Sequence, residues 1–408
     1  MTDNNCIISQ QPTANSHNHT RKKLILYITP WNVLGGGASN AIYSLMLDMK
    51  RRHTDIEPVL LCMGRPKGKM TRQCVADGIE YLVARGDIWR VDGSRFTKKV
   101  VQHIKNIVKN ILYHKKITDF LRNNHFDLVH SNTSHPLLGH EIAKRLGIPH
   151  VWHFRDFGIS DFIYSDKYVR SIHDKSAAII TISQAVYDYY VNTRKLCDAA
   201  KTRVIYDGII IPDAYDKQYL KAGHVNFCMT GKFLKNKNQI MAVRACEKLI
   251  TKTDKFMLHL IGNDTGGNYQ EYADKVKQLI HSLGLDEHIK VWGFRTDVND
   301  ILKNMDVGLM LSKREGFGLV TAEYMMNYMP VIGTDTGATP EVVLNNETGY
   351  ICRFDDSDML AELMHKFIMN PELIRDMGMK GRERAVKNFS LERNTDEVYK
   401  LYQEILSH

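Results

Sequence analysis

The chain has 408 residues, 43% of them hydrophobic and 25% charged, and its formal net charge is +9. A chain of this length exceeds one ordinary hydrophobic core, so two domains of roughly 200 residues each are expected. The composition is that of a globular protein, and no apolar run approaches the ~20 residues of a membrane span, so we expect no transmembrane segment. The positive charge favours an anionic partner, which nucleic acid, an acidic membrane surface or a phosphorylated substrate would each satisfy.

The first 20 residues and the cysteines indicate the cellular compartment of the protein. Residues 1–20 are polar and lack an apolar run behind a basic patch, so we expect a disordered leader and no secretory signal. The seven cysteines are far apart, form no C-x-x-C pair and cannot all pair internally. These features favour a reducing cytoplasm and argue against a cysteine-based metal site.

Short apolar runs alternate with helical stretches through the first half of the chain. The apolar runs lie at Leu24–Ile28, Val59–Met63, Asp127–Ser131, Val151–Phe154 and Ala177–Ser183, and the first helical stretch lies at Ala38–Arg51. Such alternation is typical of βαβ units in a parallel, doubly wound sheet. The first half therefore predicts a Rossmann-like α/β domain.

The stretch Arg95–Arg122 combines helical spacing with a strong basic charge. Val101, Ile104, Val108 and Ile111 recur at helical intervals, and lysines occupy much of the remainder. One interpretation is a helix that packs on its own domain with solvated lysines. The other is a surface that meets anionic lipid headgroups and holds the protein on the inner face of the cell membrane.

A second series of apolar runs predicts a second Rossmann-like domain. Its runs lie at Val225–Gly231, Phe256–Gly262, Ile289–Phe294, Val307–Leu311 and Pro330–Asp335. Gly208 and Pro212 punctuate the chain between the two series, and we place the hinge there. The predicted division is a leader at 1–20, domains at 21–208 and 209–389, and a C-terminal helix at 390–408 that packs back on the first domain.

Three glycines follow the first predicted strand and open a helix. The loop reads Gly35-Gly36-Gly37-Ala38-Ser39-Asn40, so backbone N–H groups of Gly36 and Gly37 could approach an anion at a helix N-terminus. The dinucleotide pattern G-x-G-x-x-G fails at Asn40, and no P-loop ending is present. A glycine turn that serves only the tight strand-to-helix connection remains an alternative.

The equivalent loop of the second half is rich in lysine. It reads Gly231-Lys232-Phe233-Leu234-Lys235-Asn236-Lys237-Asn238-Gln239. Lysines at the carboxyl end of a parallel strand could form a cradle for a diphosphate, and Lys232 and Lys237 are the better candidates. The alternative, surface lysines on the first turn of a helix, is disfavoured because such cations oppose the helix dipole unless an anion neutralises them.

Two glutamates eight residues apart follow the strand Val307–Leu311. Glu315 is expected in the loop and Glu323 about one turn inside the next helix. Between them, backbone N–H groups of Phe317, Gly318 and Leu319 could bind a phosphate oxygen or a sugar hydroxyl, while the carboxylates accept hydrogen bonds from neutral hydroxyls. Such a site suits a nucleotide sugar.

These motifs together resemble those of the retaining GT-B glycosyltransferases, in particular glycosyltransferase family 4 (glycosyl transferases group 1). From about Leu24 to the C-terminus, the Gly-Gly loop, the loop Gly231–Asn238 and the E-x7-E pattern with G-F-G-L inside it follow the order of the family motifs. The loop Gly231–Asn238 matches the family pattern G-R-x-x-x-x-K-N except that lysine replaces the arginine. The resemblance implies an α/β GT-B fold, in which two Rossmann-like domains face each other across a cleft. It also implies retention of the anomeric configuration, which the spacing of the glutamates does not prove.

The resemblance implies a role for each candidate residue. Glu315 would hydrogen-bond hydroxyls of the donor sugar and Glu323 the ribose hydroxyls, and Lys237 matches the family lysine. Lys232 stands where the family usually has arginine, so the charge is kept but a bidentate contact is lost. His153 resembles the family histidine near the transferred sugar, although a satisfied histidine at a strand end is its structural alternative.

Further candidates lie in neighbouring loops. Arg155 and Asp156 would meet the acceptor, and Asn263, Phe294 and Arg295 would flank the nucleobase. A D-x-D sequence occurs within Asp355–Asp358, but its position at a helix start indicates an N-cap cluster, and we assign it no metal.

The sequence therefore predicts transfer of a sugar from a nucleoside diphosphate sugar, with UDP-sugars favoured, to a saccharide or lipid-linked saccharide. Bacterial surface polysaccharide synthesis fits this role. The donor is a cosubstrate, and we expect neither cofactor nor metal, because lysines and backbone amides would stabilise the leaving diphosphate. The remaining alternatives are a nucleotide-sugar epimerase, a sugar-phosphate synthase and a non-catalytic sugar-nucleotide-binding protein. Nucleic acid is not expected as a partner, since no recognised nucleic-acid module is present.

Overall fold

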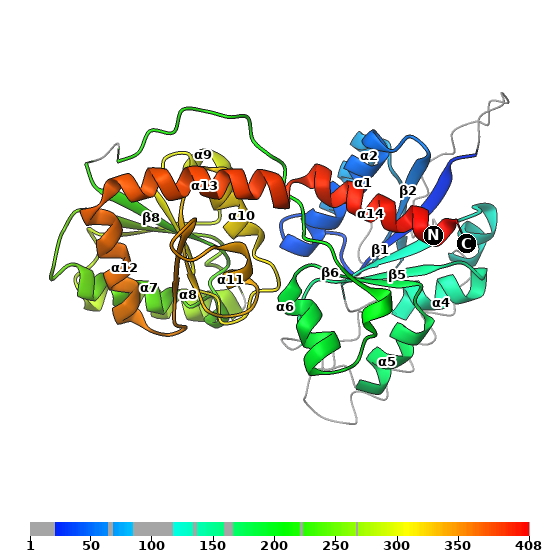
Figure 1. The fold of residues 1–408 in the computed structure, drawn as a ribbon, viewed down its shortest axis with the longest axis horizontal. Helices are drawn as coiled ribbons and strands as arrows, with labels where there is room; N and C mark the ends of the chain where they lie inside the picture. Colours follow the sequence, from blue (N-terminus) through cyan, green and yellow to red (C-terminus); the bar gives the residue numbers. More distant parts are fainter. Residues whose placement is uncertain are drawn as a thin grey trace, which may run out of the picture. The chain divides into compact units, whose positions relative to one another are not determined.

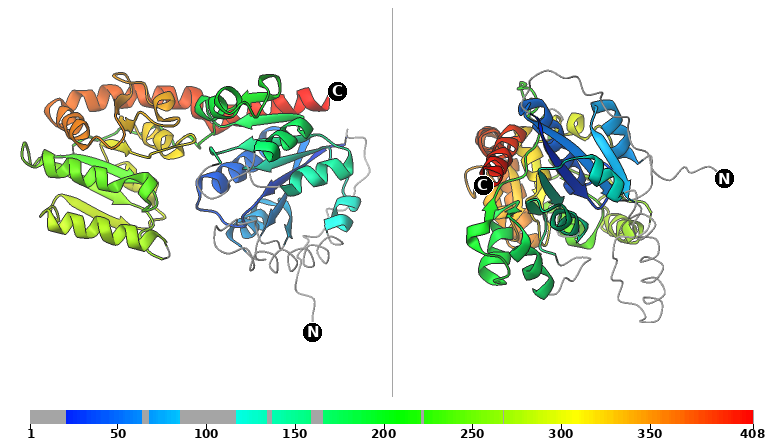
Figure 2. Two further views of the ribbon diagram at one scale, coloured as in Figure 1. Left: turned by 90° about the horizontal axis from the view of Figure 1, so that it is seen from below. Right: turned by 90° about the vertical axis from the view of Figure 1, so that its right-hand side faces the viewer.

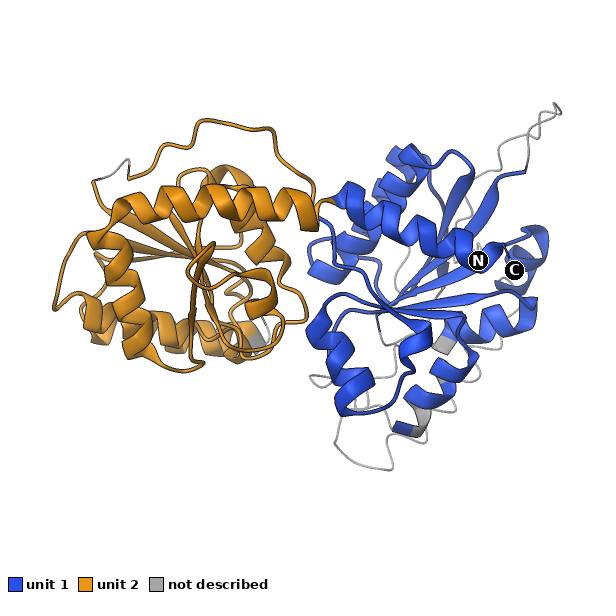
Figure 3. Cartoon of the chain, in the orientation of Figure 1, with its two compact units in different colours: residues 1–208, 391–408 blue, residues 209–390 orange. Residues whose placement is uncertain are grey.

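The computed structural model describes residues 21–63, 68–84, 117–133, 137–158, 166–220, 223–266 and 268–407. The chain divides into two compact units (Figure 3). Unit 1 contains residues 1–208 and 391–408, and unit 2 contains residues 209–390. The first boundary follows Gly208, where the sequence places the end of the first domain, and the second follows Ser390, one residue later than predicted.

Unit 1 is built on a parallel sheet of seven strands in the order β3-β2-β1-β4-β5-β6-β7. The strands are β1 (Lys23–Thr29), β2 (Ile56–Met63), β3 (Glu80–Ala84), β4 (Leu128–Asn132), β5 (His150–Phe154), β6 (Ala178–Thr181) and β7 (Thr202–Val204). Five of these strands follow the apolar runs of the sequence. The predicted run Ala177–Ser183 is too long, because Ser183 leaves the strand and its hydroxyl accepts a hydrogen bond from the N–H of Val186 as the N-cap of the next helix.

Helices cover both faces of the unit 1 sheet, as Figures 1 and 2 show. They are α1 (Gly37–Arg52), α2 (Lys69–Asp77), α4 (Leu137–Leu146), α5 (Asp166–Lys175), α6 (Gln184–Tyr187) and α14 (Leu391–Leu406), with a further helical segment at 117–123 and short turns at Asp188–Thr193 and Ala199–Lys201. Alternate residues of β1 face opposite layers: Ile25 and Tyr27 pack with α1, α2 and α14, whereas Leu26 and Ile28 pack with α4 and the helical segment at 117–123. This alternation is the period of two that a buried strand imposes.

Unit 2 repeats the plan with six parallel strands in the order β10-β9-β8-β11-β12-β13. They are β8 (Val225–Thr230), β9 (Phe256–Ile261), β10 (Ile289–Gly293), β11 (Val307–Met310), β12 (Val331–Thr334) and β13 (Gly349–Cys352). The expectation of two Rossmann-like α/β domains is confirmed, because each sheet is parallel and each is covered by helices.

The helices of unit 2 also lie on both faces of its sheet. They are the short turn η3 (Lys235–Lys237), α7 (Gln239–Leu249), α8 (Asn268–Ser282), α9 (Val298–Leu302), α10 (Leu319–Met326), α11 (Thr339–Val342), α12 (Ser357–Met369) and α13 (Pro371–Phe389). Val225, Phe227 and Met229 of β8 pack with α7, α8 and α12. Tyr324 of α10 packs on Gly308 of β11, where any larger side chain would overlap its ring.

The chain passes between the two units twice, and backbone contacts connect the two crossing segments. Ile209 donates its N–H to the carbonyl of Phe389 at 2.9 Å and forms an isolated parallel bridge with Ser390. Beyond this point α14 belongs to unit 1, where Val398, Leu401 and Tyr402 are buried in the core beside α1 (Figure 1). The C-terminal helix is therefore an integral part of the first domain.

Several expectations concern residues outside the described ranges. The predicted leader at 1–20 and the part of the basic helix at 95–116 lie there, and both stay predictions. Among the described residues, no helix is both long enough and apolar enough to cross a membrane. Six cysteines fall within the described ranges, and all six are buried free thiols.

Candidate functional site

The strand order brings the predicted motifs to the place where doubly wound folds bind ligands. In unit 1, β1 lies between β2 and β4, and in unit 2, β8 lies between β9 and β11. Along the chain, strands are added first on one side of each central strand and then on the other. The loops after β1 and β4, and after β8 and β11, therefore diverge at the carboxyl edge of the sheet and leave a crevice between them. Such a crevice is the usual ligand site of these sheets.

The glycine loop of unit 1 contains one position that requires glycine for its backbone and one that does not. Gly35 has φ +118°, which side chains rarely adopt, and its N–H donates to the amide oxygen of Asn40 at 2.9 Å. Asn40 thus braces the turn from the position where the dinucleotide pattern has its last glycine. Gly36 is the N-cap of α1 with φ −123°, and a Cβ placed on it would have no heavy atom within 4 Å. Gly37 begins the helix.

The lysine loop of unit 2 does not have the form of the disfavoured alternative, which placed its lysines on the first turn of a helix. Lys235–Lys237 forms a separate 3-10 turn, and α7 begins only at Gln239. Asn238 separates the two with a left-handed backbone, φ 63° and ψ 42°, which asparagine tolerates better than most residues. Lys237 therefore projects from the loop that follows β8. Lys232 is exposed, and its ammonium lies 5.5 Å from the ring centre of Tyr269.

An ion pair links the loops on the two sides of the unit 2 switch point. The ammonium of Lys237 lies 2.6 Å from Oε2 of Glu315, and the two side chains are 26% and 20% exposed. The backbone continues this link, since Lys313 donates its N–H to the carbonyl of Asn236 at 2.7 Å. Two residues 78 positions apart in the sequence thus form one charged, half-buried surface at the carboxyl edge of the sheet.

The loop after β12 holds Glu315 in place, which the sequence alone did not reveal. Ala338 donates its N–H to the carbonyl of Glu315 at 2.9 Å, and Thr336 donates its hydroxyl to the carbonyl of Ser312 at 2.8 Å. A Cβ on Gly337 would overlap the backbone of Glu315, so only glycine allows this close approach. A glycine two residues after a predicted strand was the available signal.

The segment between the two glutamates contains one buried anchor and one helix start. Phe317 is buried and packs edge-on against Phe389 with ring centres 5.2 Å apart. Gly318, with φ +90°, is the N-cap of α10, and Leu319 is its first residue. Glu323 falls one turn into the helix, as predicted. Burial raises the pKa of its carboxyl.

The predicted nucleobase loops follow β9 and β10. Asn263 accepts the N–H of Phe233 on its carbonyl at 3.0 Å, which ties this loop to the lysine loop. Phe294 is 61% exposed. Arg295 is also exposed, and its guanidinium donates to both carboxylate oxygens of Asp297. The charge of Arg295 is thus largely neutralised locally.

His153 of unit 1 is the next-to-last residue of β5 and is completely buried. Its Nδ1 lies 3.2 Å from Nε2 of His130, a residue that the sequence reasoning did not single out. Its Nε2 is buried and has no hydrogen-bond partner among the described parts of the chain. Burial, reinforced by the neighbouring Arg155, lowers the pKa of both imidazoles well below its usual value, which favours the neutral form of each ring.

The two residues assigned to the acceptor have internal contacts. Arg155 is buried; its guanidinium forms an ion pair with the buried Asp207 and donates to the amide oxygen of Asn132. Asp156 accepts the N–H of Gly158 at 2.7 Å and so shapes its own loop. These contacts favour a positioning role for Arg155, and contact of either residue with an acceptor stays a prediction.

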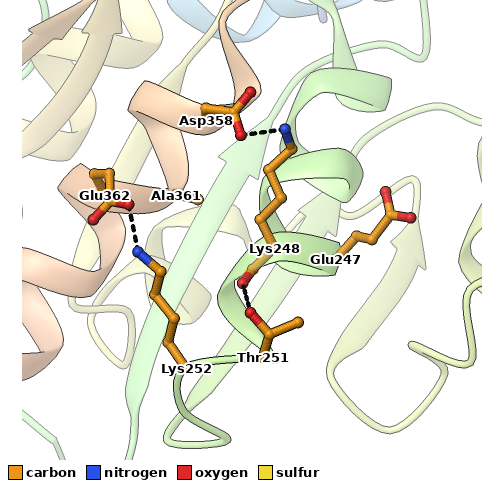
Figure 4. Close-up of a pocket in the computed structure, with 7 residues that line it drawn as sticks. All are labelled: Glu247, Lys248, Thr251, Lys252, Asp358, Ala361 and Glu362. Carbon is orange, nitrogen blue, oxygen red and sulfur yellow. Dashed lines mark hydrogen bonds and ion pairs between the residues drawn. The ribbon is translucent and has the colours of Figure 1, made fainter.

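The remaining charged features have structural explanations. Asp356 caps α12 by accepting the N–H of Met359 at 2.9 Å, which confirms the N-cap interpretation of the D-x-D sequence. A shallow groove lies between α7 and α12, where Lys248 pairs with Asp358 and Lys252 with Glu362 (Figure 4). Because each lysine already faces a carboxylate, this groove offers no net attraction to an anion.

Comparison with known proteins identifies both halves of the chain. Residues 35–211 match the sequence model of Glycosyltransferase Family 4, and residues 213–384 match that of Glycosyl transferases group 1. N-acetyl-alpha-D-glucosaminyl L-malate synthase of Bacillus anthracis is 31% identical over 174 residues, which are 43% of this chain and 44% of that enzyme. The aligned region thus spans less than half the length of this relative.

Solved structures extend the similarity to nearly the whole chain. A glycosyltransferase from Rickettsia africae has a TM-score of 0.77 at 19% identity and covers 95% of this chain and 99% of its own. Anabaena HepE in complex with UDP and glucose has a TM-score of 0.74 at 18% identity, covering 93% of this chain and 99% of its own. Both family models and these folds agree with the two parallel sheets described above, and the chain belongs to the GT-B glycosyltransferases.

Proposed function

We propose that this protein is a retaining glycosyltransferase that moves a hexosyl or N-acetylhexosaminyl group from a UDP-sugar to a saccharide or lipid-linked saccharide. The observation that carries this proposal is the ion pair between Lys237 and Glu315 at the switch point of unit 2, with Glu323 one turn into the adjoining helix. One cation and two carboxylates at such a crevice match the needs of a ligand that carries both a diphosphate and hydroxyl groups.

The leaving group sets the main chemical demand on the site. Cleavage of the bond between the anomeric carbon and the diphosphate oxygen leaves negative charge on the diphosphate. Lys237, Lys232 and the N-terminal N–H groups of α10 would stabilise that charge, because these donors are already in position when the charge develops. These groups supply the stabilisation that a divalent cation provides in other transferases, so we expect transfer to continue when divalent cations are chelated.

Retention is best explained by departure and attack on the same face of the sugar. Glu315 is occupied by Lys237 and would bind donor hydroxyls, and Glu323 would bind the ribose, so neither serves as a nucleophile. The acceptor oxygen forms the new bond to the anomeric carbon as the old bond breaks, and its proton passes to an oxygen of the departing diphosphate. A covalent glycosyl-enzyme trapped with a slow donor would contradict this mechanism.

Two comparisons support the choice of donor and role. The structure of Anabaena HepE contains UDP and glucose, which agrees with a UDP-sugar as donor for the same fold. The lipopolysaccharide core mannosyltransferase LpcC of Rhizobium leguminosarum is 26% identical over 187 residues, which supports a role in surface polysaccharide synthesis.

The decisive experiment is a transfer assay that varies donor and acceptor independently. UDP-, GDP- and dTDP-sugars would be incubated with saccharides, lipid-linked saccharides and malate, the last because of the relative from Bacillus anthracis. The proposal predicts release of UDP that depends on an acceptor. Conversion of the donor without any acceptor would indicate an epimerase, a sugar phosphate as the required acceptor would indicate a synthase, and binding without turnover would indicate a non-catalytic protein. The anomeric configuration of the product, determined by NMR coupling constants, tests retention.

A further inference from the structure

One lysine of the proposed diphosphate site already has a carboxylate partner. The ammonium of Lys237 lies 2.6 Å from Oε2 of Glu315, and the two side chains are 26% and 20% exposed. Lys232, the other candidate in that loop, has its ammonium 5.5 Å from the ring centre of Tyr269 and forms no ion pair with another residue that the structure describes. Glu315 therefore compensates the charge of Lys237 and not that of Lys232.

The backbone holds both members of this ion pair in place. Ala338 donates its N–H to the carbonyl of Glu315 at 2.9 Å, and Lys237 donates its own N–H to the carbonyl of Leu234 at 2.8 Å. Separation of the pair is therefore left to rotation of the side chains, for which the four-carbon stem of lysine is well suited. An anion that binds Lys237 must compete with Glu315, and it still has the negative charge of that carboxylate nearby.

A nucleotide sugar and the nucleotide that it leaves behind would bring different groups to this carboxylate. The hexose beside the diphosphate carries hydroxyls that can donate to Glu315 and so replace the contact with Lys237. Loss of the hexose removes these donors. It also exposes a terminal phosphate whose second ionisation lies near pH ~6, so the free diphosphate carries more negative charge than the bound donor. The carboxylate of Glu315 thus attracts the substrate and repels the product.

We propose that Glu315 is a specificity-determining residue that weakens the binding of a nucleoside diphosphate without its sugar and so favours release of the product. The inference rests on the proposed function, which assigns the diphosphate to Lys237 and the sugar hydroxyls to Glu315. Once the sugar has been transferred, Glu315 recovers Lys237 as its partner, and the diphosphate loses one of its cations. The ion pair of the unliganded protein is then the state to which product release returns the site.

Titration calorimetry of the full chain with inorganic pyrophosphate and with UDP tests this competition without any transfer reaction. Glu315→Gln removes the charge and keeps the shape of the side chain. The variant should bind both anions about fivefold more tightly or better, because a like charge is removed beside a partly exposed cation. The nucleotide sugar found in the transfer assay should gain less than about twofold, because an amide is a weaker acceptor for its hydroxyls than a carboxylate.

Three further variants separate this effect from a general change of charge. Glu362→Gln removes a carboxylate that also pairs with a lysine, Lys252, but at the other end of α7 (Figure 4), and it should bind pyrophosphate within about twofold of the wild type. Glu315→Asp keeps the charge and should retain the weak binding of the wild type. In a Lys237→Met background, Glu315→Gln should change pyrophosphate binding by less than about twofold, because the competition needs both members of the pair.

Unchanged or weaker binding of pyrophosphate by Glu315→Gln would overturn the inference, and so would an equal gain in Glu362→Gln. Failure of both the wild type and Glu315→Gln to bind either anion would overturn it as well. A wild-type chain that transfers no sugar would instead refute the proposed function, and the pyrophosphate titrations would still decide whether Glu315 opposes a diphosphate.

Discussion

The variant Lys237→Met should show whether Lys237 serves catalysis or the stability of the fold. The Lys237–Glu315 pair is still partly exposed to solvent, so Lys237→Met should change the free energy of unfolding by about 1 kcal/mol or less. If Lys237 stabilises the leaving diphosphate, kcat should fall by about 10²-fold to 10³-fold. The measurement is steady-state transfer combined with urea unfolding.

Lys252→Met provides the matched control for Lys237→Met. Lys252 also pairs with a glutamate, Glu362, but at the other end of α7 (Figure 4). Its loss should leave kcat within about twofold of the wild type, because a surface ion pair remote from the ligand contributes little. Equal losses of kcat in the two variants would show that Lys237 has no special role.

The buried carboxyl of Glu323 should make the stability of the protein depend on pH. Burial raises the pKa of its carboxyl above the ordinary value of 4.5, so the folded protein retains this proton to higher pH than the unfolded chain. The stability linked to that proton is fully present below the unfolded pKa and is lost as the pH rises through the folded pKa.

Glu323→Gln should therefore unfold at a higher temperature than the wild type near pH ~8 and show no such gain near pH ~4. The same substitution should weaken UDP binding by about 10-fold, because a carboxylate is a stronger acceptor for ribose hydroxyls than an amide. Thermal unfolding across pH and titration calorimetry measure the two effects. A variant that is stabilised at both pH values, with UDP affinity unchanged, would remove Glu323 from the site.

Two substitutions in the glycine loop before α1 can distinguish contact with a phosphate from a glycine turn that serves only the strand-to-helix connection. Gly35 has a positive φ, so Gly35→Ala should destabilise unit 1 by about 1 kcal/mol or more. Gly36 has room for a Cβ and an ordinary φ, so Gly36→Ala should unfold at the wild-type temperature within about 1 °C.

If the N–H groups of this loop approach a phosphate, Gly36→Ala should nevertheless lower kcat/KM by about 10-fold, because the added methyl occupies the path of the ligand. The comparison of thermal unfolding with kinetics decides between the interpretations. Full activity in Gly36→Ala would mean that the loop serves only the turn.

Strands with continuous apolar runs were predictable from the sequence, whereas β7 and β13 were not. Leu24–Ile28 and Val225–Gly231 are buried between two helix layers, so their hydrophobic character is continuous along the sequence. In contrast, β7 is only three residues long, with an exposed arginine at its centre, and β13 begins with a glycine. Such strands exist because a neighbouring strand offers a hydrogen-bonding edge, and this information is absent from the local sequence.

The site residues divide in the same way, into those that a local sequence motif identifies and those that only the complete fold brings together. Glu315, Glu323 and Lys237 belong to motifs that follow a strand, so their sequence positions indicated their place in the fold. His130 and Tyr402 lie in ordinary strand and helix patterns and meet only because α14 returns to unit 1. A contact between residues 272 positions apart is a property of the completed fold.

The central claim is that the full chain binds and uses a nucleotide sugar through Glu315, Glu323 and Lys237. The most direct measurement is saturation-transfer NMR with a panel of UDP-, GDP- and dTDP-sugars, on the wild type and on Glu323→Ala. We predict contact with one UDP-sugar through both its ribose and its hexose protons, and loss of this signal in Glu323→Ala. Failure of every nucleotide sugar to bind, or undiminished binding by Glu323→Ala, would contradict the claim.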